Sequence, residues 1–287
     1  MDELVAITEA RGLLKRLRID CIPVDVIAIA GSLGFNVKQS DNMAPNESGQ
    51  LFTVGGNRHI VVNASDSPVR QRFTVLHEIA HEVLGLPSNH GNAITASELE
   101  RYVSRPKEEV LCDVFAAECL VPWKLLLPMT HDSNFDAETI EQFSNTFQAS
   151  RPCVASRFAQ ASQEMLAYVL SEYGVIRYVA SSQSLRERQV WIGIGSKIPS
   201  VSAAALSRRN QTKVAEASLD GTDWSSSDSA ARFYCDEEAI SLHAWDQTLS
   251  LLTFEQKRKA NPTTYNERSE DRELLPELTG QLPWPKR

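Results

Sequence analysis

The chain has 287 residues, of which 42% are hydrophobic and 23% charged, and it carries a net charge of -8. This composition is that of a soluble globular protein with room for one large domain or two ordinary ones. The acidic balance, with an isoelectric point near 5.4, disfavours attraction of the whole protein to nucleic acid, although a local basic face remains compatible with it.

The five cysteines are odd in number, widely spaced and include no C-x-x-C pair. The sequence therefore predicts neither a disulfide framework nor a thiolate zinc site, and it favours a reducing cytoplasm as the location. The first twenty residues lack the basic-then-apolar order of a signal peptide, and no run of about 18 apolar residues occurs. We expect neither export by that route nor a membrane partner.

Helices and a small sheet are expected in the first part of the chain. Apolar residues recur at helical intervals over residues 4–17, and a second helix is expected between residues 23 and 34. A short strand is expected at residues 35–38. Residues 49–54 and 58–63 then alternate like two strands around a Gly-Gly-Asn turn, which predicts a small antiparallel sheet.

The next helix, expected from about residue 68 to residue 85, carries the pattern H-E-x-x-H. His77 and His81 stand at i and i+4 on one helix face, so both can bind one metal ion. Glu78 projects beside them and is a candidate base for the attacking water. A chance match on an amphipathic helix is the alternative, and a third ligand is needed to decide between the two.

The third ligand is expected on a helix that runs from about residue 106 to residue 122. Glu109 is the predicted ligand, and Asp113, one turn later on the same side, is predicted to hydrogen-bond a ligating histidine. Glu108 is the competing candidate, but its side chain points about 100° away around the helix axis. The alternative for these residues is a solvated acidic turn that the helix dipole stabilises.

Two further helices are expected to begin at Asp136 and Ser150, and their short junction resembles a helix-turn-helix. Arg151 and Arg157 lie on the second helix, with little further positive charge nearby. Direct DNA binding is therefore only weakly supported, and a structural helical hairpin is the preferred interpretation.

Two separate segments resemble, in order and spacing, the ImmA/IrrE family of metallopeptidases. Residues 70–81 read R-Q-R-F-T-V-L-H-E-I-A-H, which is similar to the family's R-F-T-x-x-H-E-x-x-H, and residues 109–122 are similar to its E-x-x-x-[ND]-x-F-A-x-x-[IL]-[LM]-x-P. The resemblance covers roughly the first 165 residues. It implies that the metal ligands are His77, His81 and Glu109 and that the general base is Glu78.

One departure from the common zinc-peptidase pattern is the charged Glu82 directly after His81, which we expect on the solvent side. The resemblance implies peptide hydrolysis with zinc, or with manganese as the alternative metal. In that reaction Glu78 takes a proton from water and passes it to the leaving amine. The preceding strands could hold an extended peptide beside the metal.

A donor to the oxyanion is also required, and the sequence does not choose among three candidates, His90, Tyr102 and Arg72. Arg72 has a structural ion pair as its alternative role. The resemblance further implies a protein substrate, namely a helix-turn-helix transcriptional repressor whose cleavage derepresses stress-response or mobile-element genes.

Two other functions compete with this one. The first is a non-proteolytic transcriptional regulator or anti-repressor that binds its partner and holds a structural metal. The second is a general aminopeptidase or housekeeping protease. Glu78 discriminates the first from a peptidase, because a structural metal site needs no general base.

Beyond the helical pair the sequence becomes rich in strand-forming residues. Four strands are expected, at residues 173–179, 189–194, 239–245 and 248–254. A domain boundary is expected near residues 166–172, and a frayed, charged tail from residue 255 onward.

The predicted fold class is therefore α+β, with a zincin-like helical domain, a small antiparallel sheet and a helix-turn-helix-like hairpin, followed by a smaller mixed α/β C-terminal domain. The expected divisions are 1–130 for the metallopeptidase domain, 131–168 for the helix-turn-helix-like segment and 169–287 for the C-terminal domain. We expect the last domain to sense a signal or to dock the substrate.

Overall fold

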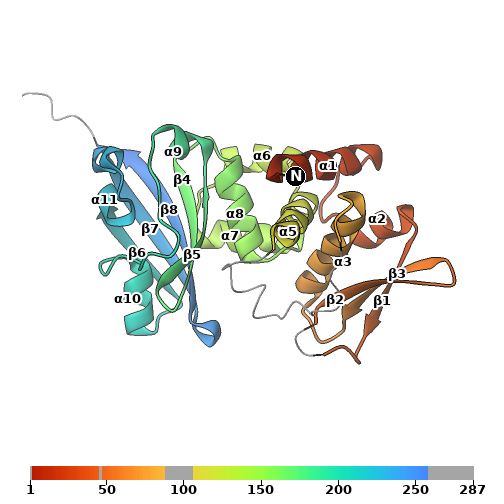
Figure 1. Cartoon of the computed structure of the whole chain (residues 1–287). Coiled ribbons are helices and arrows are strands. Elements are labelled where there is room, and N and C mark those ends of the chain that lie inside the picture. Colours follow the sequence, from red (N-terminus) through yellow and green to blue (C-terminus); the bar gives the residue numbers. More distant parts are fainter. Residues whose placement is uncertain (1, 45–46, 88–105, 258–287) are drawn as a thin grey trace, which may run out of the picture. The chain divides into compact units, whose positions relative to one another are not determined.

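The computed structural model describes residues 2–44, 47–87 and 106–257, and within these ranges the chain forms helices and two β-sheets (Figure 1). One sheet has three strands and belongs to the first part of the chain, whereas the other has five and follows the helical hairpin. The predicted α+β class is confirmed. None of the described helices is long and apolar enough to cross a membrane.

The helices and strands predicted before residue 85 are all present. They are α1 (Glu3–Arg16), α2 (Val26–Ser32), β1 (Phe35–Ser40), β2 (Gly49–Val54), β3 (Asn57–Asn63) and α3 (Pro68–Val83). Helix α2 begins later than expected because Asp25 caps it, accepting hydrogen bonds from the amides of Ile27 and Ala28. Gly55 and Gly56 form the β2–β3 turn with φ of +57° and +82°, which suits glycine.

The first sheet has the strand order β1-β3-β2. The hairpin of β2 and β3 is antiparallel, as expected, whereas β1 pairs with β3 in parallel. The sheet is therefore mixed, because the chain crosses from one edge to the other between β1 and β2. Within the described ranges, the outer edge of β2 pairs with no other strand.

Among the described residues from 106 onward, four helices come first: α5 (Lys107–Leu120), α6 (Trp123–His131), α7 (Ala137–Phe147) and α8 (Arg151–Ala161). Three of them were predicted, and α6 was not. Asp136 and Ser150 cap α7 and α8 as expected, accepting hydrogen bonds from backbone amides three residues later.

The arginines of α8 are engaged within the chain. Arg157 is buried, and its Nη2 lies 2.5 Å from Oε2 of the buried Glu118 on α5, while Arg151 is paired with Glu141 on α7. Glu118 also accepts a hydrogen bond from Nε of Arg11 on α1 at 3.0 Å. These contacts connect α1, α5 and α8. They agree with the preferred interpretation of the hairpin as a structural one.

The remaining elements form an antiparallel sheet in the order β5-β4-β8-β7-β6, with short helices around it. They are β4 (Leu166–Glu172), β5 (Val175–Ser181), α9 (Gln183–Glu187), α10 (Ala203–Asn210), β6 (Val214–Asp220), α11 (Gly221–Trp224), η1 (Asp228–Arg232), β7 (Phe233–Leu242), η2 (His243–Trp245) and β8 (Gln247–Gln256).

The prediction of a strand at residues 189–194 is wrong. Val190 and Ile192 are buried in the second, smaller hydrophobic core, but the segment does not form a strand. The strand predicted to end at Trp245 ends at Leu242, because a short 3-10 helix and Asp246, with φ of +50°, make the turn to β8. Strands β4 and β6 were not predicted.

Strand β4 contributes to two hydrophobic cores. Leu166, Tyr168 and Leu170 belong to the larger core, which also contains the apolar faces of α1, α3, α5 and α8, whereas Ala167 and Val169 belong to the second core. The boundary expected at residues 166–172 coincides with this strand, and the domain division stays a prediction. The frayed tail was predicted from residue 255, but Glu255 and Gln256 still belong to β8, and the tail from residue 258 onward lies outside the described residues.

Candidate metal centre

Helices α3 and α5 pack against each other and supply the candidate site. Ser67 caps α3 by accepting a hydrogen bond from the Arg70 amide at 3.3 Å, and Pro68 occupies the first turn, so the helix begins where the sequence predicts. Every residue from 74 to 81 is buried, including the three polar residues of the H-E-x-x-H pattern. Polar groups held in the interior in this way need partners, and α5 provides them.

The two histidines and Glu109 lie close together. His77 Nε2 is 3.1 Å from Glu109 Oε2 and 3.3 Å from His81 Nε2, and His81 Nε2 is 3.7 Å from Glu109 Oε1. Nitrogen and oxygen ligands at about 2.0–2.1 Å from a tetrahedral zinc ion lie about 3.3 Å from one another. The three side chains therefore fit one face of a tetrahedral metal site.

Asp113 lies behind the first histidine. Its Oδ1 is 3.0 Å from His77 Nδ1, which directs the Nε2 atom of the ring toward Glu109 and His81. A carboxylate in this position holds a metal-binding imidazole in one tautomer and orientation. Burial lowers the pKa of His77, but the hydrogen bonds to Asp113 and Glu109 outweigh burial and raise it to about 9.

Glu78 is buried on the same helix. Burial and, to a lesser extent, the neighbouring charge of Glu109 raise its pKa to about 7, against the opposing effect of His77. A carboxyl group with a pKa near neutrality can both accept and release a proton, which is the requirement for a general base that later acts as an acid.

Strand β2 begins beside Glu78. A Cβ atom at Gly49 would lie 2.2 Å from Thr74 Cγ2 and 3.5 Å from Glu78 Oε1. Only glycine permits this approach of strand and helix. Strand β2 therefore starts close to the candidate base.

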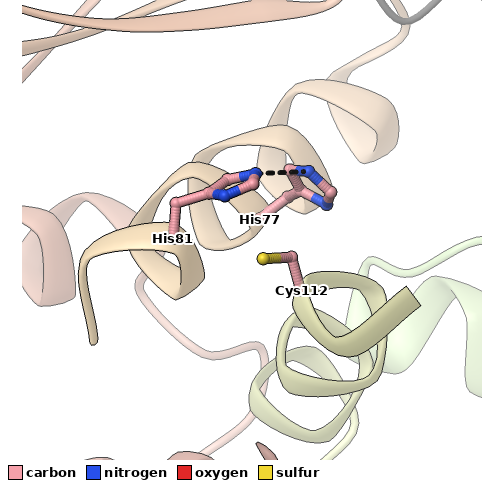
Figure 2. Close-up of side chains that lie close together, drawn as sticks. All are labelled: His77, His81 and Cys112. Carbon is pink, nitrogen blue, oxygen red and sulfur yellow. Dashed lines mark hydrogen bonds between the residues drawn. The ribbon is translucent and has the colours of Figure 1, made fainter. Parts of the chain in front are cut away.

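Cys112 is a donor that the sequence analysis missed. Its sulfur lies within 4.8 Å of a ring nitrogen of His77 and of His81, and all three residues are buried. Figure 2 shows the thiol pointing from α5 toward the two rings. In the sequence, the only sign of this donor is that Cys112 follows Glu109 by three residues, about one helical turn. That spacing is informative only when Glu109 is already taken as a ligand.

The other predicted residues lie in different surroundings. Arg72 donates hydrogen bonds to two backbone carbonyls, from Nε to Gln148 at 3.1 Å and from Nη2 to Val24 at 2.8 Å. Burial lowers its pKa, although Asp25 opposes this. The guanidinium thus connects α3 to two neighbouring segments by contacts with backbone carbonyls. The remaining oxyanion candidates, His90 and Tyr102, lie outside the described residues.

Two glutamates flank the predicted ligands. Glu108 is half-buried, whereas its neighbour Glu109 is buried against the histidines. Glu82 is exposed, as expected, and its Oε1 lies 2.7 Å from Arg58 Nη1.

Comparisons with known proteins agree with this geometry. Residues 30–159, which include α3 and α5, match the model of the IrrE N-terminal-like domain family. The radiation response metalloprotease IrrE of Deinococcus radiodurans is 33% identical over 117 residues. This match covers 39% of the present chain and 30% of the relative, so the chain spans less than a third of that protein.

Among solved structures, a Mycobacterium tuberculosis transcriptional regulator is similar with a TM-score of 0.55 and 11% identity. The similarity covers 86% of this chain and 75% of that one, and it shows a shared fold. The two motif segments, the domain match and the relative agree on one assignment: residues 30–159 form an IrrE N-terminal-like domain, the domain of the ImmA/IrrE family.

Proposed function

We propose that this chain is a metal-dependent endopeptidase that cleaves a helix-turn-helix transcriptional repressor and thereby derepresses stress-response or mobile-element genes. The observation that carries the proposal is the buried group on α3 and α5, in which Glu109 contacts both histidines and Glu78 stands beside them. The domain match and the metalloprotease relative support the same class of reaction.

The chemistry assigns a separate task to each side chain. His77, His81 and Glu109 would hold the metal, which, when bound, acidifies water and polarises the scissile carbonyl. Asp113 keeps His77 oriented by its contact at Nδ1. Glu78 takes the proton of the attacking water and delivers it to the leaving amine, and its burial beside the metal ligands places it for both steps.

The substrate is proposed to bind along β2. Among the described residues, β2 is an outer strand of its sheet, and an outer strand is where an extended peptide can be added to a sheet. Gly49 lies at the start of the strand, against Thr74 and close to Glu78. A peptide added to this edge would pass beside the base and the metal ligands.

A protein substrate of the repressor type is supported by the resemblance of residues 30–159 to the ImmA/IrrE family and by the name of the relative, a radiation response metalloprotease. The competing function is a non-proteolytic regulator with a structural metal site. Cys112 is the observation that favours it, because a fourth protein donor is typical of structural zinc sites. Glu78 favours the peptidase, because a structural site has no use for a buried carboxyl group beside it.

The substitution Glu78→Gln tests the proposal. The zinc-loaded full chain would be incubated with purified helix-turn-helix repressors and with unrelated proteins of similar size, and fragments would be identified by mass. The wild type is expected to cut a repressor at one site, while E78Q retains its metal and loses cleavage by a factor of about 100 or more.

The matched control is Glu82→Gln, which makes the same chemical change on the same helix at an exposed position. This variant is expected to cleave like the wild type, because its ion pair with Arg58 is exposed. Cleavage by E78Q at the wild-type rate would contradict the mechanism. Rapid cleavage of every protein in the panel would instead indicate a housekeeping protease.

A further inference from the structure

The proposed mechanism leaves the Cys112 thiol unused, although it lies beside the metal ligands. We propose that Cys112 is a fourth protein ligand, which binds the metal as a thiolate together with His77, His81 and Glu109. This inference rests on the proposed metal centre and concerns its resting state. It also bears on which metal the site takes.

The placement of the sulfur carries the proposal. Cys112 is fully buried on α5, and its sulfur and one nitrogen from each histidine all lie within 4.8 Å of one another. In a tetrahedral zinc site with a sulfur at about 2.3 Å, sulfur and nitrogen ligands are about 3.6 Å apart. The upper limit of 4.8 Å is within about 1.2 Å of that ligand spacing, and Figure 2 shows the sulfur on the side of α5 that faces the two rings.

The position on the helix agrees with this role. Glu109 and Cys112 are three residues apart, so they lie one above the other on the face of α5 that packs against α3. Asp113, the next residue, contacts His77. One turn of α5 thus supplies two donors to the metal and one support for a metal-binding histidine.

Cys119 illustrates the ordinary role of a buried cysteine. It lies on α5 seven residues after Cys112 and belongs to the hydrophobic core, where burial raises its pKa well above the usual range. A thiol in such surroundings acts as a small apolar side chain. Cys112 also fills space in the core, but in addition it faces two imidazole nitrogens.

Thiolate ligation would have two consequences. As a ligand, the Cys112 thiol would give up its proton to solvent and would fill the position that catalytic zinc sites keep open for water, so the site would be closed at rest. A thiolate also selects zinc, whereas carboxylate and water ligands suit manganese. The cysteine thereby makes zinc the preferred metal.

Cobalt substitution of the full chain tests the ligation directly, because a thiolate bound to Co²⁺ gives a charge-transfer absorption in the near ultraviolet. Wild type, Cys112→Ala and the matched control Cys119→Ala would be loaded with Co²⁺ alone, and zinc and manganese affinities would be measured by competition with a chelator. Cys112→Ser provides a second variant of nearly the same volume.

The absorption is expected in the wild type and in C119A and is expected to be absent from C112A and C112S. Zinc affinity should fall by about tenfold or more in both Cys112 variants, while manganese affinity changes less than twofold. Cobalt-loaded wild type without the band, or zinc affinity in C112S equal to that of C119A, would overturn the proposal.

The two proposals fail in different ways. A chain that shows the thiolate band but cleaves no protein supports Cys112 as a ligand and removes the peptidase. A chain that cleaves in a Glu78-dependent manner without the band keeps the peptidase and removes the fourth ligand.

Discussion

His77 is the residue at which a proton and a metal ion compete. Without metal its pKa is about 9, because Asp113 and Glu109 stabilise the charged imidazole more than burial destabilises it. Binding of a metal at Nε2 replaces the interactions that favour the proton. The same two carboxylates therefore serve both states of the ring.

The raised pKa values of His77 and Glu78 predict how the stability of the metal-free chain depends on pH. Both groups bind protons more tightly in the folded chain than in the unfolded chain. Folding raises the pKa of Glu78 from 4.5 to about 7 and the pKa of His77 from 6.5 to about 9. Because the folded state holds more protons, the free energy of unfolding decreases as pH rises through these windows. The expected contribution of His77 is on the order of 3 kcal/mol.

Urea unfolding in the presence of a chelator, from pH 5 to pH 9, measures this effect. The wild type should lose stability as pH rises, and His77→Gln should flatten the curve above pH 6.5. A wild-type curve that rises over the same range, or one that H77Q does not alter, would show that the histidine is not held by the two carboxylates.

Asp113 gives a second test at the level of a single side chain. Asp113→Asn removes the negative charge that faces His77 Nδ1 but keeps a hydrogen-bond acceptor. Zinc affinity should fall by about 10- to 100-fold, the usual effect of removing a partner of a metal-binding histidine. Titration against a chelator measures it, and Glu108→Gln, a change of charge on the same helix, is the control. Equal affinities in wild type and D113N would refute this role.

The sequence was sufficient for the residues whose chemistry depends on helical spacing. His77, His81, Glu109 and Asp113 were predicted from intervals of three or four residues and from the resemblance, and the structure brings them together. The backbone carbonyls that accept hydrogen bonds from Arg72 belong to segments distant in sequence, so no local pattern could reveal them.

At the level of whole elements, the close contact between β2 and α3 positions the substrate edge. Gly49→Ala would place a Cβ atom 2.2 Å from Thr74 Cγ2, so either the strand or the Thr74 side chain must shift. We expect a loss of about 1–3 kcal/mol in stability and a larger loss of cleavage than of bound metal. Denaturation, cleavage and metal content measure the three effects.

The contact itself can be tested by compensation. Thr74→Ser deletes the methyl group that a Cβ at Gly49 would meet, so the double variant should recover most of the stability and cleavage that G49A loses. Gly31→Ala in α2 is the matched control, since nothing lies within 4 Å of its added Cβ atom. Additive effects of G49A and T74S would contradict the close packing of strand and helix.

Elements with local signals were predicted well, and elements without them were missed. Helices α3 and α8 have a serine cap and an early proline, and the β2–β3 turn has two glycines. Strand β4 is buried along its whole length, so it lacks the alternation that marks a half-buried strand. Residues 189–194 are the opposite case. Their apolar residues alternate as in a strand and pack into the second core, but the segment does not form a strand.

In the molecule as a whole, the candidate metal centre lies within the larger core. Strand β4 contributes side chains both to that core and to the second core. No sequence pattern foretold this sharing, because it depends on which face of a doubly buried strand meets which helix. The sensing or docking role of the C-terminal sheet stays a prediction. Any shortened chain that ends before β4 would remove part of the core beneath α8.

The central claim is that α3 and α5 together form one metal site. Metal analysis of the purified full chain beside His77→Ala, Glu109→Ala and the control Glu108→Ala tests it most directly. One metal ion per chain is expected in the wild type and E108A, and a loss of most bound metal is expected in H77A and E109A, because Glu109 contacts both histidines. Equal metal in all four proteins would contradict the site.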